Sequence, residues 1–265
     1  MTITTPRPVT GTVLSADGTR IAYDQRGQGP VVVLVGGAFS DRAWRGEVAL
    51  AEALADRFTT VTYDRRGRGD SIPATAGYDR AREVEDLAAL AKHVGASYLY
   101  GMSSGGVLVL AALAAGVPAR KAALYEPPYV SEGLPPADYA DRLRALVAAD
   151  DAAGAARYFL KQVMGVPAAF LAVMKLTPGW KLAVRLAPSL PYDADLMGDF
   201  GIPAEFAGIT TPTLVVGGGK SAQRLRDGVA SVTSAVPGAR QSVLPGQNHD
   251  PKPAVLASAL RDFFD

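Results

Sequence analysis

Short apolar runs alternate with amphipathic stretches over much of the chain. Val31–Val35 is wholly apolar and lies between glycines, which is typical of a strand buried on both faces of a parallel sheet. Arg82–Val94 instead repeats apolar residues at helical spacing and ends at Gly95. The same patterns predict further strands at Thr12–Leu14, Arg20–Asp24, Thr59–Tyr63, Ser97–Tyr100, Lys121–Tyr125, Thr213–Val216 and Gln241–Leu244. They predict further helices at Asp41–Asp56, Ser104–Ala115, Ala222–Ala235 and a C-terminal segment that aligns Leu256, Leu260, Phe263 and Phe264.

This alternation of strands and helices predicts a mostly parallel sheet flanked by helices. A sheet of this kind has its ligand site at the carboxyl ends of its strands. One stretch, residues 128–209, breaks the alternation because it contains helical patterns punctuated by prolines and no convincing strand. We therefore predict a core domain of residues 1–127 and 210–265, with residues 128–209 inserted as a helical cap.

Composition narrows the class of protein. The 265 residues are 48% hydrophobic, enough for one large α/β domain with an insertion. The 27 basic and 26 acidic residues give a net charge of +1, which does not favour nucleic acid or a membrane surface as a partner. The chain has no cysteine, so disulfides and thiolate metal sites are excluded. The start, MTITTPRPVTGTVLS, lacks the apolar core of a signal peptide, and we expect a cytoplasmic protein.

The segment Gly101-Met102-Ser103-Ser104-Gly105 carries the clearest chemical signal. It is a G-x-S-x-G sequence between a predicted strand and a predicted helix, the arrangement called a nucleophile elbow. The turn is so tight that glycine is needed on both sides of the central serine. We predict that Ser103 is a nucleophile displayed at a helix N-terminus, where backbone amides favour developing negative charge.

Several segments together resemble the α/β-hydrolase superfamily over nearly the whole chain, most closely its cap-bearing serine esterase and perhydrolase branches. The matching segments are VVVLVGGAF at 31–39, YDRRGRGDS at 63–71, Gly101–Gly106, AALYEPP at 122–128, Thr213–Gly218 and QNHD at 247–250. The resemblance implies an α/β-hydrolase fold with an eight-stranded, mostly parallel sheet and a helical cap after the sixth strand. It also implies a serine nucleophile, a histidine base and a carboxylate, in the chain order Ser…acid…His.

The resemblance implies that His249 is the base, because it lies in a polar turn between the last strand and the last helix. His93, the other histidine, is near a helix end and is expected to be a surface residue. The family most often has its acid after the strand Thr213–Val216, where this chain has glycines instead. Some branches have the acid at the end of the preceding core strand, and Glu126 matches that position. We prefer Glu126; the other candidates are Asp250, Asp227, Asp193, Asp195 and Asp199.

The oxyanion donors are expected to be two backbone amides. One is the N–H of Ser104, and the other comes from the loop after Val31–Val35, where we choose Ala38 and then Phe39. The family usually has His-Gly in that loop, and this chain has Gly36-Gly37. The basic loop Asp64–Ser71 could bind an anion, but we favour arginines and aspartates that hold a loop together. Apolar residues expected to line a substrate pocket are Phe39, Phe159, Met164, Phe170, Met174 and Trp180.

These features predict a serine hydrolase that needs no cofactor or metal and cleaves carboxylic esters or lactones of small to medium apolar compounds through an acyl-enzyme on Ser103. The expected partner is a small ester-like molecule. The sequence leaves open whether the protein forms a homo-oligomer. One alternative uses the same triad for perhydrolysis, C–C bond hydrolysis or a lyase or cyclase step. A second is a non-catalytic ligand-binding protein on the same fold.

Overall fold

The computed structural model describes residues 8–73, 78–131 and 134–265. Residues 1–7, part of the stretch in which we expect no signal peptide, lie outside the described residues. The described chain forms an eight-stranded sheet with the order β1-β2-β4-β3-β5-β6-β7-β8. Strands β3 to β8 pair in parallel, whereas β2 is antiparallel to both β1 and β4. The predicted mostly parallel, eight-stranded sheet is confirmed.

Three strands have the bounds that the apolar pattern predicts: β3 (Val31–Val35), β4 (Thr59–Tyr63) and β6 (Lys121–Tyr125). These strands lie in the interior of the sheet, and their side chains are almost all buried. The remaining strands are one to three residues longer than the pattern indicates. They are β1 (Val9–Leu14), β2 (Arg20–Arg26), β5 (Ala96–Met102), β7 (Thr213–Gly218) and β8 (Arg240–Leu244).

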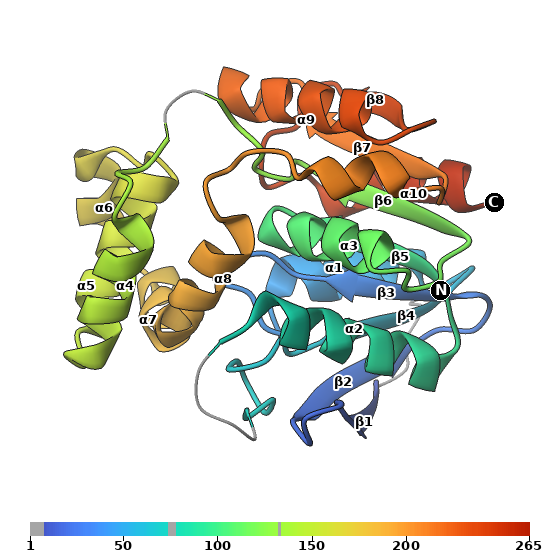
Figure 1. Cartoon of the computed structure of the whole chain (residues 1–265), viewed down its shortest axis with the longest axis horizontal. Helices are drawn as coiled ribbons and strands as arrows, with labels where there is room; N and C mark the ends of the chain where they lie inside the picture. The colour runs from blue at the N-terminus through green and yellow to red at the C-terminus, as the bar shows by residue number, and fades with distance from the viewer. Residues whose placement is uncertain (1–7, 74–77, 132–133) are drawn as a thin grey trace, which may run out of the picture.

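Helices cover both faces of the sheet (Figure 1). Helices α1 (Arg45–Leu54) and α10 (Pro253–Phe264) pack against each other and share a core with one face. The other face is covered by α2 (Arg80–Val94), α3 (Ser104–Ala114) and α9 (Gln223–Ala235). The predicted helix Asp41–Asp56 is too long, because Asp41 and Trp44 form a hydrogen-bonded turn ahead of the first helical residue. In the described part of the chain, no helix combines the length and the apolar character that crossing a membrane requires.

Between β6 and β7 the described residues contain helices and no strand, which confirms the helices predicted after the sixth strand. We call residues 139–208 the inserted segment. It contains α4 (Tyr139–Ala148), α5 (Ala152–Tyr158), a π-helical turn (Phe159–Val163), α6 (Ala168–Met174), α7 (Pro178–Leu186), α8 (Leu190–Met197) and the 3-10 turns Ala187–Ser189 and Ala204–Gly208. Its division from the core at residues 127/128 and 209/210 stays a prediction.

Helix α8 joins the inserted segment to the core. It packs against α2 and α3, while α4, α5, α6 and α7 stand to one side of the sheet (Figure 1). Because α8 covers α3, that helix is buried from Ser104 to Leu113 and is accordingly apolar nearly all round. The hydroxyl of Tyr139 on α4 lies within hydrogen-bond distance of the carbonyls of Ala194 and Gly198, which share its one proton, and this fixes α4 to the end of α8. The inserted segment is therefore packed directly onto the helix that begins at the elbow.

Candidate active site

Ser103 stands between β5 and α3 with φ 52° and ψ −124°, a backbone conformation that L-residues rarely adopt. The turn leaves no room for side chains on either side of it. A Cβ on Gly101 would lie 2.5 Å from the carbonyl oxygen of Gly105, and one on Gly105 would lie 2.1 Å from that of Val35. The strand–turn–helix context and the glycine requirement expected of an elbow are both present.

Glu126 follows β6, the strand beside β5, and also has a positive φ, 47°. Its side chain is fully buried. Carboxylate Oε2 lies 2.7 Å from Nδ1 of His249, and Oε1 accepts the N–H of Gly218 at 2.7 Å. The structure thus brings Glu126 and His249 together across 123 residues of sequence.

The surroundings of Glu126 favour its ionised form. Burial alone would raise its pKa, but the hydrogen bonds from His249 and from the Gly218 amide outweigh burial and hold the pKa below its ordinary value. An ionised carboxylate only accepts hydrogen bonds, so Nδ1 of His249 carries the proton in this contact. In a neutral imidazole with its proton on Nδ1, Nε2 is free to accept a proton, as a general base requires.

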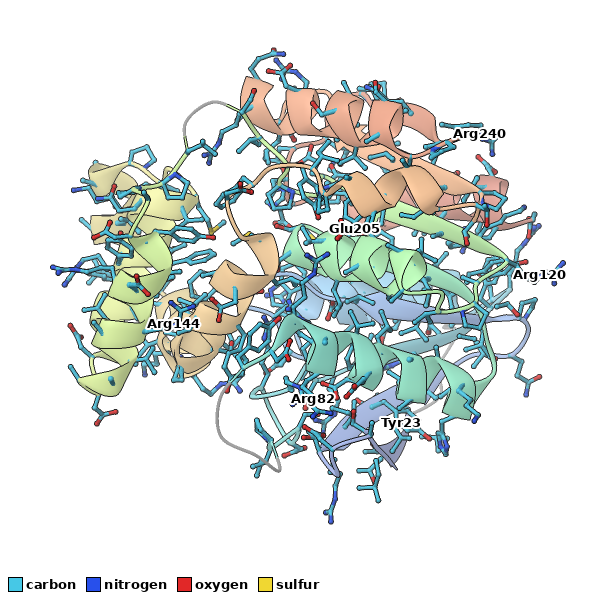
Figure 2. All side chains as sticks on the ribbon, viewed as in Figure 1. Tyr23, Arg82, Arg120, Arg144, Glu205 and Arg240 are labelled. Atoms are coloured by element: carbon cyan, nitrogen blue, oxygen red, sulfur yellow. The ribbon has the colours of Figure 1, made fainter. Side chains whose placement is uncertain are left out.

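Gly218, the last residue of β7, explains why no larger residue stands at this strand end. Gly218 donates its amide to Glu126, and a Cβ there would lie 2.6 Å from the carbonyl oxygen of Gln247, just before the histidine. The histidine loop is also held by Tyr125, whose hydroxyl donates to the carbonyl of Asn248 at 2.5 Å. The alternative acid Asp227 accepts from Gln223 on its own helix. His93 contacts Tyr23, on the side of β1 and β2 (Figure 2).

The loop after β3 lies against the elbow. A Cβ on Gly37 would be 3.1 Å from the Cβ of Ser103 and 3.0 Å from the Met102 carbonyl oxygen, so glycine permits this approach. Phe39 has φ 58°, which makes it the third non-glycine residue with positive φ in this region, beside Ser103 and Glu126. The amides of Ala38 and Ser104 therefore belong to segments adjacent to the nucleophile, and their role as oxyanion donors stays a prediction.

The aromatic and methionine residues proposed for the substrate pocket have different environments. Phe159 is buried and meets Phe39 edge to face, with ring centroids 5.4 Å apart. Met174 and Trp180 are half-buried. Met164 and Phe170 are 39% and 61% exposed. The Phe39–Phe159 contact is thus where the loop after β3 meets the inserted segment, and the lining roles of all six stay predictions.

The basic loop Asp64–Ser71 holds a buried ion network rather than an open anion site. The side chains of Arg65, Arg66 and Arg68 are each about 1% exposed and are paired with carboxylates. Arg66 pairs with Asp86 and Asp17, on the α2 side. Asp64 accepts from the backbone and side chain of Arg42. This pattern agrees with the loop-holding role that the sequence favours.

Asp193, on α8, is the buried counter-ion of two of these arginines. Arg65 and Arg68 both donate to it, as does the hydroxyl of Ser104, the residue after the nucleophile. Burial by itself would raise its pKa, but the two arginines and the Ser104 hydrogen bond hold the pKa below its ordinary value. The sequence raised Asp193 only as a remote candidate for the triad acid.

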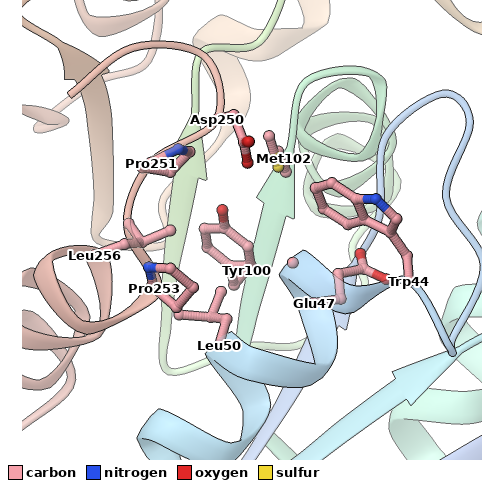
Figure 3. A pocket seen from close by; sticks show the side chains of 10 residues that line it. Trp44, Glu47, Leu50, Tyr100, Met102, Asp250, Pro251, Pro253 and Leu256 are labelled. Carbon is pink, nitrogen blue, oxygen red and sulfur yellow. The ribbon is translucent and has the colours of Figure 1, made fainter. Parts of the chain in front are cut away.

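A small cavity of about 20 Å³ lies behind the elbow, among residues of α1, β5 and the histidine loop (Figure 3). It is lined by Trp44, Gly46, Glu47, Leu50, Tyr100, Met102, Asp250, Pro251, Pro253 and Leu256. The Glu47 atom Oε1 and the Tyr100 hydroxyl are buried and have no hydrogen-bond partner among the described residues. Burial raises the pKa of Glu47 to about 8, against the attraction of Arg68. Nothing in the sequence pattern marked this glutamate, because it occupies an ordinary position in the first turn of a helix.

Comparison with known proteins agrees with this architecture. The sequence pattern of the Alpha/beta hydrolase family matches residues 31–259. The crystal structure of an alpha/beta hydrolase from Sphaerobacter thermophilus DSM 20745 is 45% identical, with a TM-score of 0.90 over 96% of this chain and 100% of that chain.

Two curated relatives match over shorter stretches. "Uncharacterized hydrolase YraK" of Bacillus subtilis (strain 168) is 37% identical over 101 residues, which are 37% of this chain and 36% of that protein. "Soluble epoxide hydrolase" of Corynebacterium sp. (strain C12) is 36% identical over 80 residues, which are 30% of this chain and 27% of that protein. The matched stretches thus span 36% and 27% of the length of these curated relatives. From the family match over most of its length, with the fold and the elbow described above, the chain belongs to the alpha/beta hydrolase family.

Proposed function

We propose that the protein is a cofactor-independent serine hydrolase that cleaves carboxylic esters or lactones of small to medium apolar compounds. The observation that carries the proposal is the 2.7 Å contact between Glu126 and His249, at the end of the strand next to Ser103. A serine hydroxyl is a poor nucleophile and needs an oriented base beside it. A buried carboxylate that holds one histidine tautomer is the support such a base requires.

In the proposed reaction, Ser103 Oγ attacks the acyl carbon while His249 Nε2 accepts its proton. The amides of Ala38 and Ser104 donate to the oxygen that becomes negative. His249 then gives the proton to the leaving alcohol, and a water molecule, activated by the same histidine, hydrolyses the acyl-enzyme. Glu126 stabilises the imidazolium throughout without being protonated itself.

The apolar preference follows from the inserted segment. Phe159 is buried against Phe39, beside the proposed oxyanion loop, and Trp180 packs against the same hydrophobic core. Apolar walls with a few polar groups are typical of sites for small organic ligands. An uncharged acyl or alcohol group fits such walls better than a charged one, because burying a charge without a partner is costly.

Epoxide hydrolysis, suggested by the name of one relative, is not favoured for this chain. That chemistry needs a carboxylate nucleophile to form an alkyl-ester intermediate. The elbow carries Ser103, and the nearby Glu126 is engaged by His249 and Gly218. The arrangement therefore favours acyl transfer.

The test is covalent labelling with a fluorophosphonate, followed by peptide mapping and by ester hydrolysis across a series of chain lengths. We expect one adduct per chain, on Ser103, and no adduct in Ser103→Ala. In His249→Ala the hydrolysis rate should fall by a factor close to that of Ser103→Ala, because the two act as a unit. The fall in Glu126→Gln should be smaller, roughly 10²- to 10⁴-fold, since the carboxylate orients the base but does not react.

Asp227→Asn is the matched control. It removes a carboxylate that follows β7 but that bonds to Gln223, so kcat should be unchanged. Full activity in Ser103→Ala, or wild-type activity in Glu126→Gln together with a loss in Asp227→Asn, would contradict the assignment.

A further inference from the structure

The carboxylate of Asp193 occupies an unusual place, because it belongs to the inserted segment but is buried next to the elbow. Its side chain is 0% exposed. Oδ1 accepts from the hydroxyl of Ser104 at 2.7 Å and from Arg65 Nη1 at 2.9 Å, and Oδ2 accepts from Arg68 Nη2 at 2.7 Å. One side chain of α8 therefore contacts the residue after the nucleophile and two arginines of the core.

The two arginines continue to the loop after β3. Arg65 Nη1 donates to the carbonyl of Gly36 at 3.3 Å, and Arg68 Nη1 donates to that of Gly37 at 2.6 Å. The hydroxyl of Ser40 adds a second donor to the Gly37 carbonyl at 2.7 Å. Asp193 is thus linked to each of the two carbonyls that precede Ala38 through one arginine, Arg65 or Arg68.

The orientation of the Gly37 carbonyl determines the direction of the Ala38 N–H. Both groups belong to one planar trans peptide unit, in which the C=O and the N–H point in opposite directions. Donors from Arg68 and Ser40 that draw the carbonyl to one side therefore aim the amide to the other. The Ser104 amide is fixed separately, because the Ser103 carbonyl of its peptide unit accepts the N–H of Gly106 at 2.8 Å.

We propose that Asp193 is a positioning residue that ties the inserted segment to the residues that supply both oxyanion donors, holding Ser104 through its side-chain hydroxyl and the Gly37–Ala38 peptide through Arg68. The proposal rests on the proposed hydrolase function for its catalytic consequence. It implies that the seating of α8 and the alignment of the oxyanion hole are coupled. A substrate that displaces α8 would also disturb the donors that its own transition state needs.

Charge pairing within the network singles out Asp193. Arg65 retains Glu83 as a second carboxylate partner, and Arg66 has Asp86 and Asp17. Among the described residues, Arg68 makes its salt bridge to Asp193 and otherwise donates to the carbonyls of Gly37 and Ser40. Without Asp193, the arginine that holds the Gly37 carbonyl is therefore the one left without a salt-bridge partner among the described residues.

The first experiment compares Asp193→Asn with Asp86→Asn, in the full chain, by ester hydrolysis and fluorophosphonate labelling. Each variant removes the carboxylate from a buried arginine–aspartate salt bridge. Asp86, however, makes no hydrogen bond or salt bridge to the loop after β3 among the described residues. We expect Asp193→Asn to lower kcat roughly 10- to 100-fold with KM within about twofold, because loss of a whole donor costs roughly 10²- to 10³-fold. The labelling rate should fall by a similar factor, and Asp86→Asn should keep the kcat of the wild type.

Ser40→Ala keeps the proposal testable if Asp193→Asn does not fold. It removes one of the two donors to the Gly37 carbonyl and changes no charge. We expect a smaller decrease in kcat, roughly 3- to 10-fold, again with little change in KM. Unchanged kcat in both Asp193→Asn and Ser40→Ala would overturn the proposal.

Hydrogen exchange measured by mass spectrometry separates this inference from the proposed function. Peptides that cover residues 36–40 should exchange faster in Asp193→Asn than in the wild type or Asp86→Asn, whether or not any ester is cleaved. If the wild type cleaves no ester but these peptides still exchange faster in Asp193→Asn, the result would support the coupling and contradict the hydrolase assignment. Equal exchange of these peptides in all three proteins would overturn the coupling, even for an active enzyme.

Discussion

Glu47 shows how a single buried carboxyl can connect the site to solution pH. It lies behind the oxyanion loop, where a Cβ on Gly36 would approach its Oε1 to 2.3 Å. Burial raises its pKa to about 8 from the ordinary 4.5. Since removal of an isolated charge from water is costly, the neutral acid is the form that this position accepts at neutral pH.

The expected consequence is a pH-dependent stability. The unfolded chain releases this proton near pH 4.5 and the folded protein only near pH 8, so the folded state binds more protons in between. The free energy of unfolding therefore falls as pH rises through this window, by up to about 1.4 kcal/mol per pH unit from this group. In Glu47→Gln this decline should be absent, as measured by urea unfolding between pH 5 and pH 9. Glu52→Gln, on the exposed side of the same helix, is the control and should keep the wild-type slope; equal slopes in all three proteins would contradict the assignment.

At the scale of elements, the close approach of β3, the elbow and α3 depends on glycine. Gly105→Ala would place a methyl group 2.1 Å from the Val35 carbonyl oxygen, which belongs to a rigid central strand. We expect a loss of roughly 3 kcal/mol or more in the free energy of unfolding, together with loss of labelling at Ser103. Gly208→Ala is matched to it, because a Cβ there meets nothing within 4 Å, and its stability should change by less than about 0.5 kcal/mol. Similar urea midpoints for the two variants would refute this account of the elbow.

The same scale shows why some elements could be predicted closely from the sequence and others could not. Central strands such as β3 are apolar throughout, so the ends of the pattern coincide with the ends of the strand. Helix α1 begins at Arg45, after a hydrogen-bonded turn between Asp41 and Trp44. The residues of this turn continue the helical pattern in the sequence, so the predicted start is four residues too early. The inserted helices could be recognised as helical, but the packing of α8 onto α3 depends on side chains with no local signature.

The residues of the candidate site likewise differ in how far local sequence could predict them. Ser103 and His249 have local context, because each lies in a turn between a strand and a helix. Glu126 was preferred on its position at a strand end, and its contact with the histidine required the fold. Asp193 and Glu47 owe their surroundings to residues far away in sequence, so no local pattern could reveal the ion network or the raised pKa.

For the whole molecule, the core and the inserted segment share one hydrophobic cluster. Val107 and Leu110 of α3 belong to the same cluster as Leu143, Phe159 and Leu190 of the inserted helices. The Asp193 salt bridges cross the same boundary. We therefore expect one cooperative unfolding transition, with a calorimetric enthalpy equal to the van't Hoff enthalpy within about 10–20%. Two resolved transitions in a calorimetric scan would mean that the inserted segment unfolds on its own.

The two tryptophans of the chain fall on either side of that boundary. Trp44 lines the small cavity beside Glu47, whereas Trp180 lies on α7 with the ammonium group of Lys175 5.7 Å from its ring centre. The protein thus carries one tryptophan in each part. In Trp44→Phe, all indole emission would come from the inserted helices, and in Trp180→Phe all of it would come from the core. Tryptophan emission could then report on each part separately while a ligand binds, without an added dye.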